Sequence, residues 1–223
     1  MILAVDSTST LASVAVVNEL DNRIVSVRRA QVTRHSDDLL AMIGEALDEA
    51  GVLVKDLDAI ACAAGPGSFT GLRIGLATVK GLCLATARPL VMISSLESLA
   101  ARAPAGTRTL ATIDALKGEV YAQWLTAGLP PVSLGDARVL SPERLALDFS
   151  REDSFSIIGD ALVRYPALAV AQARVVDTNP SDAVEIGRLA IVRRARGESD
   201  PLAAAAPRYV RPSEAELLAD ARH

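Results

Sequence analysis

The chain has 223 residues, of which half are hydrophobic and only 3% are aromatic, so its core must be built from Leu, Ile, Val and Ala. The formal net charge of −4 argues against a protein that grips nucleic acid unaided, because such proteins usually present a basic face. The sequence begins on a strand-like run, MILAVD, with no basic leader, and no apolar run reaches the roughly 20 residues that a membrane span needs. We therefore expect a soluble, cytoplasmic protein with no membrane contact.

The first half of the chain is predicted to run β-β-β-α-β-α-β. Apolar or alternating runs predict strands at residues 2–6, 11–18, 23–31, 58–64 and 90–93, and apolar stripes at helical spacing predict helices at 36–50 and 68–87. Short links between the first three strands predict an antiparallel meander. This order is found in the ribonuclease-H-like fold of the actin, sugar-kinase and Hsp70 superfamily, a duplicated α/β architecture.

The second half resembles a reduced second copy of the first. A hinge at residues 103–106 precedes strand patterns at 109–114, 119–125, 155–158 and 174–176, and helical patterns from 141 and over 181–196. We predict an N-terminal actin-like subdomain over residues 1–103 and a reduced C-terminal one over 104–223. The tail at 207–212 is expected to be extended, and Ser213 with Glu216 forms a capping-box pattern for a last short helix.

The stretch GPGSFTGLRIG at residues 65–75 joins a predicted strand to a predicted helix. Its glycines and proline predict a tight turn, with Ser68 as the N-cap of the helix. The spacing matches neither a Walker loop nor G-x-G-x-x-G, so a tightly packed helix is favoured over phosphate binding. Gly71 and Gly75 each cost about 1 kcal/mol in a helix relative to alanine. Close approach of another helix on their side is the simplest compensation.

The turn after the first strand carries Asp6, Ser7 and Thr8. In the actin-like architecture, an Asp and small hydroxyl residues at this place face nucleotide phosphate and its magnesium, so these three are candidate nucleotide-binding residues. Asp6 can equally close a turn through its own side chain, and both interpretations stay open. Weak or vestigial nucleotide binding is the one cofactor role that the sequence suggests.

Four motifs resemble the TsaB family, which is also called YeaZ. They are ILAVDSTST at residues 2–10, GPGSFTGLRIGLATVKGL at 65–82, DALKGEVYAQW at 114–124 and PRYVRP at 207–212. The resemblance covers most of the chain but little of residues 125–176. It implies a noncatalytic paralogue of the enzyme TsaD, which acts with the ATPase TsaE to place threonylcarbamoyl on adenosine 37 of tRNA (t6A37).

The resemblance therefore implies a subunit without catalytic residues that binds and activates a TsaD-like threonylcarbamoyltransferase together with a TsaE-like ATPase. It also implies a homodimer in isolation and contact with tRNA only through the complex. TsaD holds its metal with a His-x-x-x-His run, and Ser95 and Leu99 stand at the two histidine places here. The only histidines of the chain are His35 and His223, and Cys62 and Cys83 lie in apolar surroundings. We expect no bound metal.

Two other functions compete with this one. Asp6 favours a nucleotide-binding phosphotransferase or ATPase of the same architecture, although fold resemblance alone does not carry function and no catalytic carboxylate stands out in the second half. A peptidase ranks lower, because the sequence contains neither G-x-S-x-G nor H-E-x-x-H.

The helices predicted at 36–50 and 68–87 are joined by one strand, so right-handed crossovers put them side by side on one face of the sheet. Each carries apolar residues on more than one face, which leaves a stripe without a partner in the chain. We predict a helical-bundle interface there, used for the homodimer and for the TsaD-like partner. Its predicted members are His35, Leu39, Leu40, Ile43, Phe69, Gly71, Leu72, Arg73 and Gly75.

Overall fold

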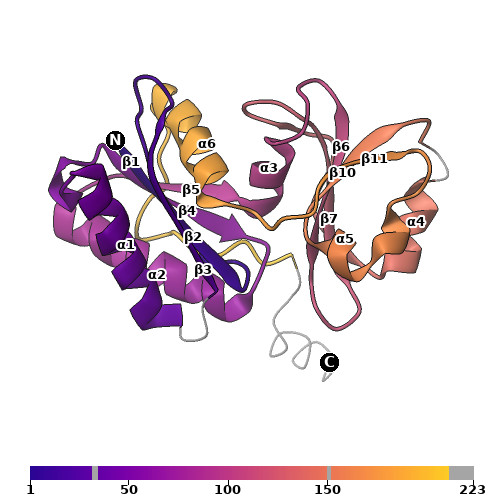
Figure 1. The fold of residues 1–223 in the computed structure, drawn as a ribbon, viewed down its shortest axis with the longest axis horizontal. Coiled ribbons are helices and arrows are strands. Elements are labelled where there is room, and N and C mark those ends of the chain that lie inside the picture. Colours follow the sequence, from indigo (N-terminus) through magenta and orange to yellow (C-terminus); the bar gives the residue numbers. More distant parts are fainter. Residues whose placement is uncertain (32–34, 150–151, 211–223) are drawn as a thin grey trace.

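The computed structural model describes residues 1–31, 35–149 and 152–210. For residues 35–37 it describes the backbone but not the side chains. These residues form two lobes, each built on one β-sheet (Figure 1). The short helix predicted to follow Ser213 lies outside the described residues. Across the described ranges, we find no helix that is both long and apolar enough to cross a membrane.

The first lobe holds a five-stranded sheet in the order β3-β2-β1-β4-β5. Neighbouring strands are antiparallel in the meander from β1 to β3 and parallel from β1 through β4 to β5. The predicted meander with parallel crossovers is thus confirmed, with strand ends within one or two residues of their predicted places. The strands are β1 (Ile2–Asp6), β2 (Leu11–Val17), β3 (Ile24–Gln31), β4 (Ala59–Gly65) and β5 (Leu90–Ser94).

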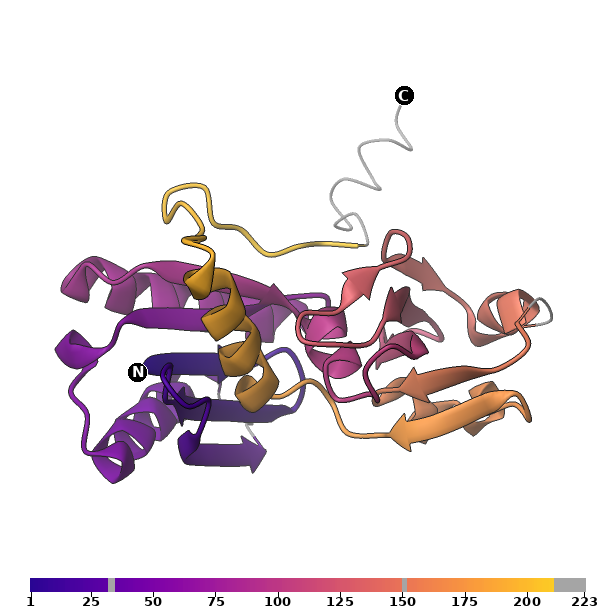
Figure 2. The same ribbon diagram turned by 90° about the horizontal axis from the view of Figure 1, so that it is seen from above.

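Helices cover both faces of the first sheet (Figures 1 and 2). On one face lie α1 (His35–Ala50) and α2 (Phe69–Thr86), with the short 3-10 helix η1 (Val54–Asp56) before β4, and on the other lies α6 (Ala183–Ala195). Strand β1 shows why two covers are needed, because successive side chains point to opposite faces of a sheet. Leu3 and Val5 belong to the core beneath α1 and α2, whereas Ile2 and Ala4 belong to the core beneath α6.

The second lobe holds a sheet in the order β11-β10-β6-β7-β8, with β9 also paired to β7. Apolar residues of α4 and α5, with Phe155 and Ile157 of β10, form the core on one face. Leu96 and Leu99 of α3 pack on the other face. The elements are α3 (Ser95–Ala100), β6 (Arg108–Asp114), β7 (Val120–Thr126), β8 (Val132–Ser133), β9 (Arg138–Leu140), α4 (Pro142–Phe149), β10 (Phe155–Ile158), α5 (Ala161–Arg164), η2 (Pro166–Leu168) and β11 (Ala173–Asp177).

The C-terminal part of the chain does not stay with the second lobe, contrary to the subdomain predicted over residues 104–223. Helix α6 packs on the first sheet through Ile186 and Leu189. Beyond it, the Asp200 N–H donates to the Leu90 carbonyl oxygen at 2.8 Å, beside β5. The apolar stripe of α6 fills the face that α1 and α2 leave open, so this segment completes the first lobe (Figure 2).

The glycine-rich stretch forms the predicted strand, turn and helix. The Ser68 hydroxyl accepts a hydrogen bond from the Gly71 N–H at 3.3 Å, which confirms Ser68 as the N-cap of α2. The prediction that another helix approaches Gly71 and Gly75 was wrong. A Cβ on Gly71 would lie 1.8 Å from the Ser7 carbonyl oxygen, and one on Gly75 would lie 2.2 Å from the Ser7 hydroxyl. The missing side chains at these two glycines allow the turn after β1, rather than a second helix, to pack closely against α2.

Gly71→Ala is therefore expected to lower the free energy of unfolding by about 1–3 kcal/mol, the usual range for overpacking a filled site. The matched control is Gly81→Ala in the same helix, because a Cβ there meets nothing within 4 Å. That change is expected to be neutral or to stabilise the helix by up to about 1 kcal/mol. Urea unfolding of both variants checks the pair, and equal effects would contradict this packing.

Candidate functional site

The turn after β1 lies between the lobes and is closed by the chain's own side chains. Asp6 is only 1% exposed. One of its carboxylate oxygens accepts from the Thr8 N–H at 2.8 Å and from the Thr8 hydroxyl at 2.6 Å, and the other accepts from the hydroxyl of Ser181. The Ser7 hydroxyl donates to the Gly71 carbonyl oxygen at 2.8 Å. This geometry supports the turn-closing interpretation of Asp6. Nucleotide binding stays a hypothesis, and it requires these bonds to be displaced.

Acidic side chains gather around this turn. Burial raises the pKa of Asp6 above its usual value, and the hydrogen bonds from Ser181 and Thr8 act against that rise. Burial also raises the pKa of Asp160 to about 6, and its carboxylate accepts from the Asp114 N–H at 3.0 Å. Among the residues with described side chains, no group of three His, Cys, Asp or Glu could hold a metal ion. The expected absence of a metal stays a prediction.

Ser95 and Leu99, at the two predicted histidine places, are both fully buried. Leu99 packs in the second lobe's core, and the Ser95 hydroxyl has no hydrogen-bond partner within the described part of the chain. The two cysteines are buried and unpaired, and burial raises the pKa of Cys83 to about 11, so its thiol stays protonated. These side chains behave as core residues.

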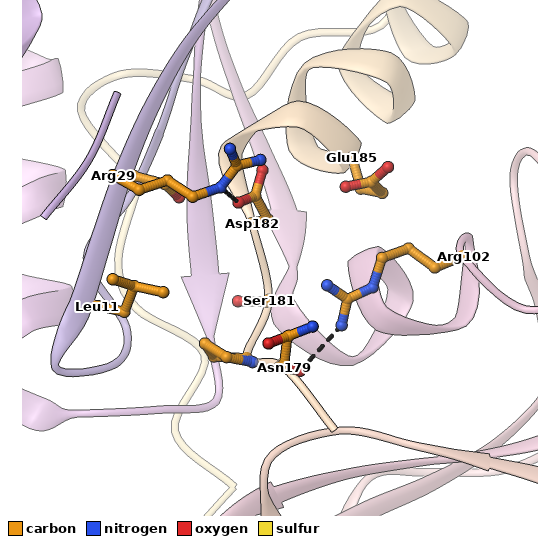
Figure 3. A pocket seen from close by; sticks show the side chains of 9 residues that line it. Leu11, Arg29, Arg102, Asn179, Ser181, Asp182 and Glu185 are labelled. Atoms are coloured by element: carbon orange, nitrogen blue, oxygen red, sulfur yellow. Dashed lines mark hydrogen bonds and ion pairs between the residues drawn. The ribbon is translucent and has the colours of Figure 1, made fainter. Parts of the chain in front are cut away.

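A cavity of about 300 Å³ opens between the lobes, beside the N-terminus of α6 (Figure 3). Its charged groups already have partners: Arg29 pairs with Asp182, and Arg102 donates to the Asn179 carbonyl oxygen at 2.9 Å. We therefore assign it no catalytic role. Sequence reasoning missed this cavity because four distant segments form it without a local motif. Its lining residues are Leu11, Ser13, Arg29, Arg102, Asn179, Pro180, Ser181, Asp182 and Glu185.

The outer face of α1 and α2 carries apolar side chains that stay largely exposed among the described residues. Leu40 is 55% exposed on α1, Phe69 is 45% exposed at the start of α2, and Leu84 is 72% exposed near its end. Arg73 is exposed one turn after Phe69. Of the nine predicted interface residues, Leu40, Phe69 and Arg73 thus lie on this surface, and their use in docking stays a prediction.

Five of the predicted interface residues do not lie on the outer face, and their prediction was wrong. The side chains of Leu39, Ile43 and Leu72 are buried within the chain, because they point toward the sheet. Gly71 and Gly75 pack against the turn after β1. His35 begins α1, and its side chain lies outside the described residues.

Sequence reasoning missed four residues of the outer face, namely Leu84, two glycines and a tyrosine. A Cβ on Gly44 of α1 or on Gly81 of α2 would meet nothing within 4 Å, so both backbones are open to close approach. Gly44 is the one glycine of α1, and Gly81 lies six residues after Gly75, so neither extends the four-residue spacing of Gly71 and Gly75. Tyr209 comes from the C-terminal segment and stands with its ring centroid 5.4 Å from that of Phe69. No local pattern could place a residue 136 positions after Arg73 on the same surface.

The two lobes, with a meander followed by parallel crossovers in the first, define an actin-like protein of the ribonuclease-H-like fold, as predicted. The solved structure of YeaZ from Pseudomonas aeruginosa superposes with a TM-score of 0.81 at 32% identity, covering 93% of this chain and 98% of that one. The chain belongs to the TsaB (YeaZ) family.

Two further comparisons concern parts of the chain. The family model described as TsaD, tRNA N6-adenosine threonylcarbamoyltransferase, matches residues 28–127. The tRNA threonylcarbamoyladenosine biosynthesis protein TsaB of Escherichia coli is 37% identical over 123 residues, which are 54% of this chain and 52% of that protein. A tRNA N6-adenosine threonylcarbamoyltransferase of Erythrobacter litoralis is 44% identical over 63 residues, 28% of this chain and 18% of that enzyme. The matching region thus spans about half the length of the curated TsaB relatives.

Proposed function

We propose that this chain is a noncatalytic cytoplasmic subunit in the synthesis of t6A37 in tRNA. In this proposal, it docks on a TsaD-like threonylcarbamoyltransferase and activates it together with a TsaE-like ATPase, and it meets tRNA only through that complex. The names of the relatives support the pathway. The observation that carries the docking role is the exposed apolar outer face of α1 and α2, where Leu40, Phe69 and Leu84 are 55%, 45% and 72% exposed.

The match to the TsaD model supports the choice of partner. The matched residues 28–127 include both α1 and α2, so a TsaD-like enzyme is expected to present a related helical pair. A surface that pairs with its own copy across a two-fold axis can pair with a paralogue in the same way. One face therefore serves a homodimer in isolation and the enzyme in the working complex.

The contacts of Asp6 support the noncatalytic role. Both carboxylate oxygens already accept hydrogen bonds from within the chain, and the side chain is buried. The second candidate function, a phosphotransferase or ATPase, rests on the place of Asp6 in the fold and needs this carboxylate to be free for a nucleotide and its magnesium.

ATP turnover separates the two functions. The purified chain alone is expected to show no turnover near ordinary enzyme rates, on the order of 1 per second or more. A TsaD-like enzyme with its TsaE-like ATPase is expected to modify tRNA faster when this chain is added. Turnover by the chain alone, lost in Asp6→Asn, which keeps the shape of the side chain, would favour the phosphotransferase.

A further inference from the structure

The cavity between the lobes lies where the two segments that connect them meet. Residues 101–107 lead from α3 to β6, and residues 178–182 lead back from β11 to α6. Arg102, on the first segment, donates to the Asn179 carbonyl oxygen of the second at 2.9 Å. Ligand sites are common at such junctions between domains, and about 300 Å³ is the lower end of their usual volume. The cavity thus has the place and the size of a site for a small molecule.

Four charged side chains line this cavity. Figure 3 shows Arg29 and Arg102 on opposite sides of it, with their guanidinium groups pointing inward. The acids Asp182 and Glu185 belong to the first turn of α6, and each of their side chains is only 12% exposed. Charged groups held this far from water depend on partners of opposite charge. A ligand in the cavity therefore meets charges of both signs.

The two arginines keep unused hydrogen-bond donors. Arg29 donates through Nε to Asp182 at 2.5 Å, and no described residue accepts from its two terminal amino groups. Nε of Arg102 is buried, and it also lacks an acceptor among the described residues. A buried donor without an acceptor is costly, and a ligand carboxylate would supply the missing oxygen atoms.

Opposite charges also face each other across the cavity without touching. Burial raises the pKa of Glu185 above its usual value, and Asp182 adds to the rise. Arg102 and Arg188 act against it. Glu185 forms an ion pair with Arg188 at 3.1 Å, whereas the ion pair of Arg102 is with Asp177 at 3.4 Å. Arg102 and Glu185 thus influence each other from beyond ion-pair distance, which leaves room for a ligand between them.

This mixture of charges favours a ligand that carries both signs. A simple anion would meet Asp182 and Glu185 as well as the arginines, and a simple cation would meet the arginines. A zwitterion avoids both conflicts, because its carboxylate can face Arg102 while its ammonium faces Glu185. Leu11 and Pro180 also line the cavity and offer apolar contact to a short side chain.

We propose that the cavity between the lobes binds a small free amino acid, with its carboxylate on Arg29 and Arg102 and its ammonium on Glu185. A bound amino acid contacts both segments that connect the lobes and is expected to raise the thermal stability of the chain. The site uses no residue of the outer face of α1 and α2, so this inference does not rest on the proposed docking role.

Thermal unfolding and isothermal titration calorimetry of the full chain test the site, with glycine, L-alanine, L-serine, L-threonine and L-leucine as probes. At about 10 mM, at least one probe is expected to raise Tm by about 3 °C or more, as a Kd of about 1 mM or tighter implies. The same molecule without its ammonium, or without its carboxylate, is expected to bind at least about 10-fold more weakly. For L-alanine these analogues are propionate and ethylamine.

Charge variants assign the two ends of the ligand. Glu185→Gln keeps the shape of the side chain and removes its charge, so it is expected to weaken the amino acid about 10-fold or more and to leave the ammonium-free analogue unaffected. Arg102→Lys keeps the charge but loses Nε, and it is expected to weaken both ligands. The matched controls, Glu45→Gln on α1 and Arg144→Gln on α4, are exposed and should change neither affinity.

Three results would overturn the inference. The first is that none of the five probes shifts Tm or gives heat of binding. The second is that the ammonium-free analogue, or inorganic phosphate, binds the original chain as tightly as the amino acid, because the cavity would then be a general anion site. The third is unchanged affinity in a folded Glu185→Gln variant. If that variant fails to fold, the comparison of analogues on the original chain still decides.

Discussion

Asp6→Ala is expected to lower the free energy of unfolding by about 2–5 kcal/mol. The change removes the acceptor of three buried donors, namely the Thr8 N–H and the hydroxyls of Thr8 and Ser181. Each buried donor left without a partner costs about 1–3 kcal/mol, and the hydroxyls can recover part of this by turning toward each other. Urea unfolding measures the loss.

Asp6→Asn is the matched control for this prediction. It keeps one acceptor oxygen for Thr8, and the Ser181 hydroxyl can turn to accept from the new amide, so a smaller loss is expected. If Asp6→Ala unfolds within about 0.5 kcal/mol of the original chain, the usual spread for uninvolved surface sites, then Asp6 is not a structural residue. The nucleotide interpretation would then gain ground.

Gly81→Leu and Leu40→Glu are each expected to weaken binding of the TsaD-like partner about 10-fold to 100-fold. Gly81 is open in the isolated chain, so leucine fits there without clash, but it fills space that a closely packed partner helix needs. That change in affinity corresponds to about 1.4–2.8 kcal/mol, which lies within the range of about 1–3 kcal/mol for overpacking. Leu40→Glu places a charge where an exposed apolar side chain is expected to be buried on docking.

Leu20→Glu is the control for this pair, because Leu20 is 96% exposed and lies in the β2–β3 turn, outside both helices. Circular dichroism and thermal unfolding verify that all three variants fold. Pull-down and sedimentation with the purified partner then give the affinities. If both Gly81→Leu and Leu40→Glu bind the partner with unchanged affinity, the interface lies on another surface.

The elements of the fold were predictable because their signals are local. Glycine, proline and a capping serine predict the turn at residues 65–68, and the spacing of apolar residues predicts the helices. The packing of α6 on the first sheet was not predictable, because its sequence shows an apolar stripe but not the sheet that the stripe contacts. In the structure both faces of β1 are apolar, and α6 covers the face opposite to α1 and α2.

The candidate site was predictable only in part, because a local sequence pattern does not show which distant residues become neighbours. Leu39 and Leu40 are adjacent and equally apolar, yet one is buried and the other is 55% exposed, because successive helical residues point about 100° apart. Gly71 and Gly75 correctly indicate a close neighbour, but their spacing does not say that Ser7 is that neighbour. The hydrogen bond from Arg73 to Tyr209 joins two segments that only tertiary structure brings together.

The central claim is that this chain acts as the docking subunit of a TsaD-like enzyme. The most direct test co-expresses it with the TsaD-like and TsaE-like proteins of the same source, separates the complex by size exclusion, and quantifies t6A37 in tRNA. The account predicts a co-eluting complex and t6A37 that forms with the original chain, falls sharply with Gly81→Leu, and is nearly absent when the chain is omitted. Equal t6A37 with and without the chain would contradict it.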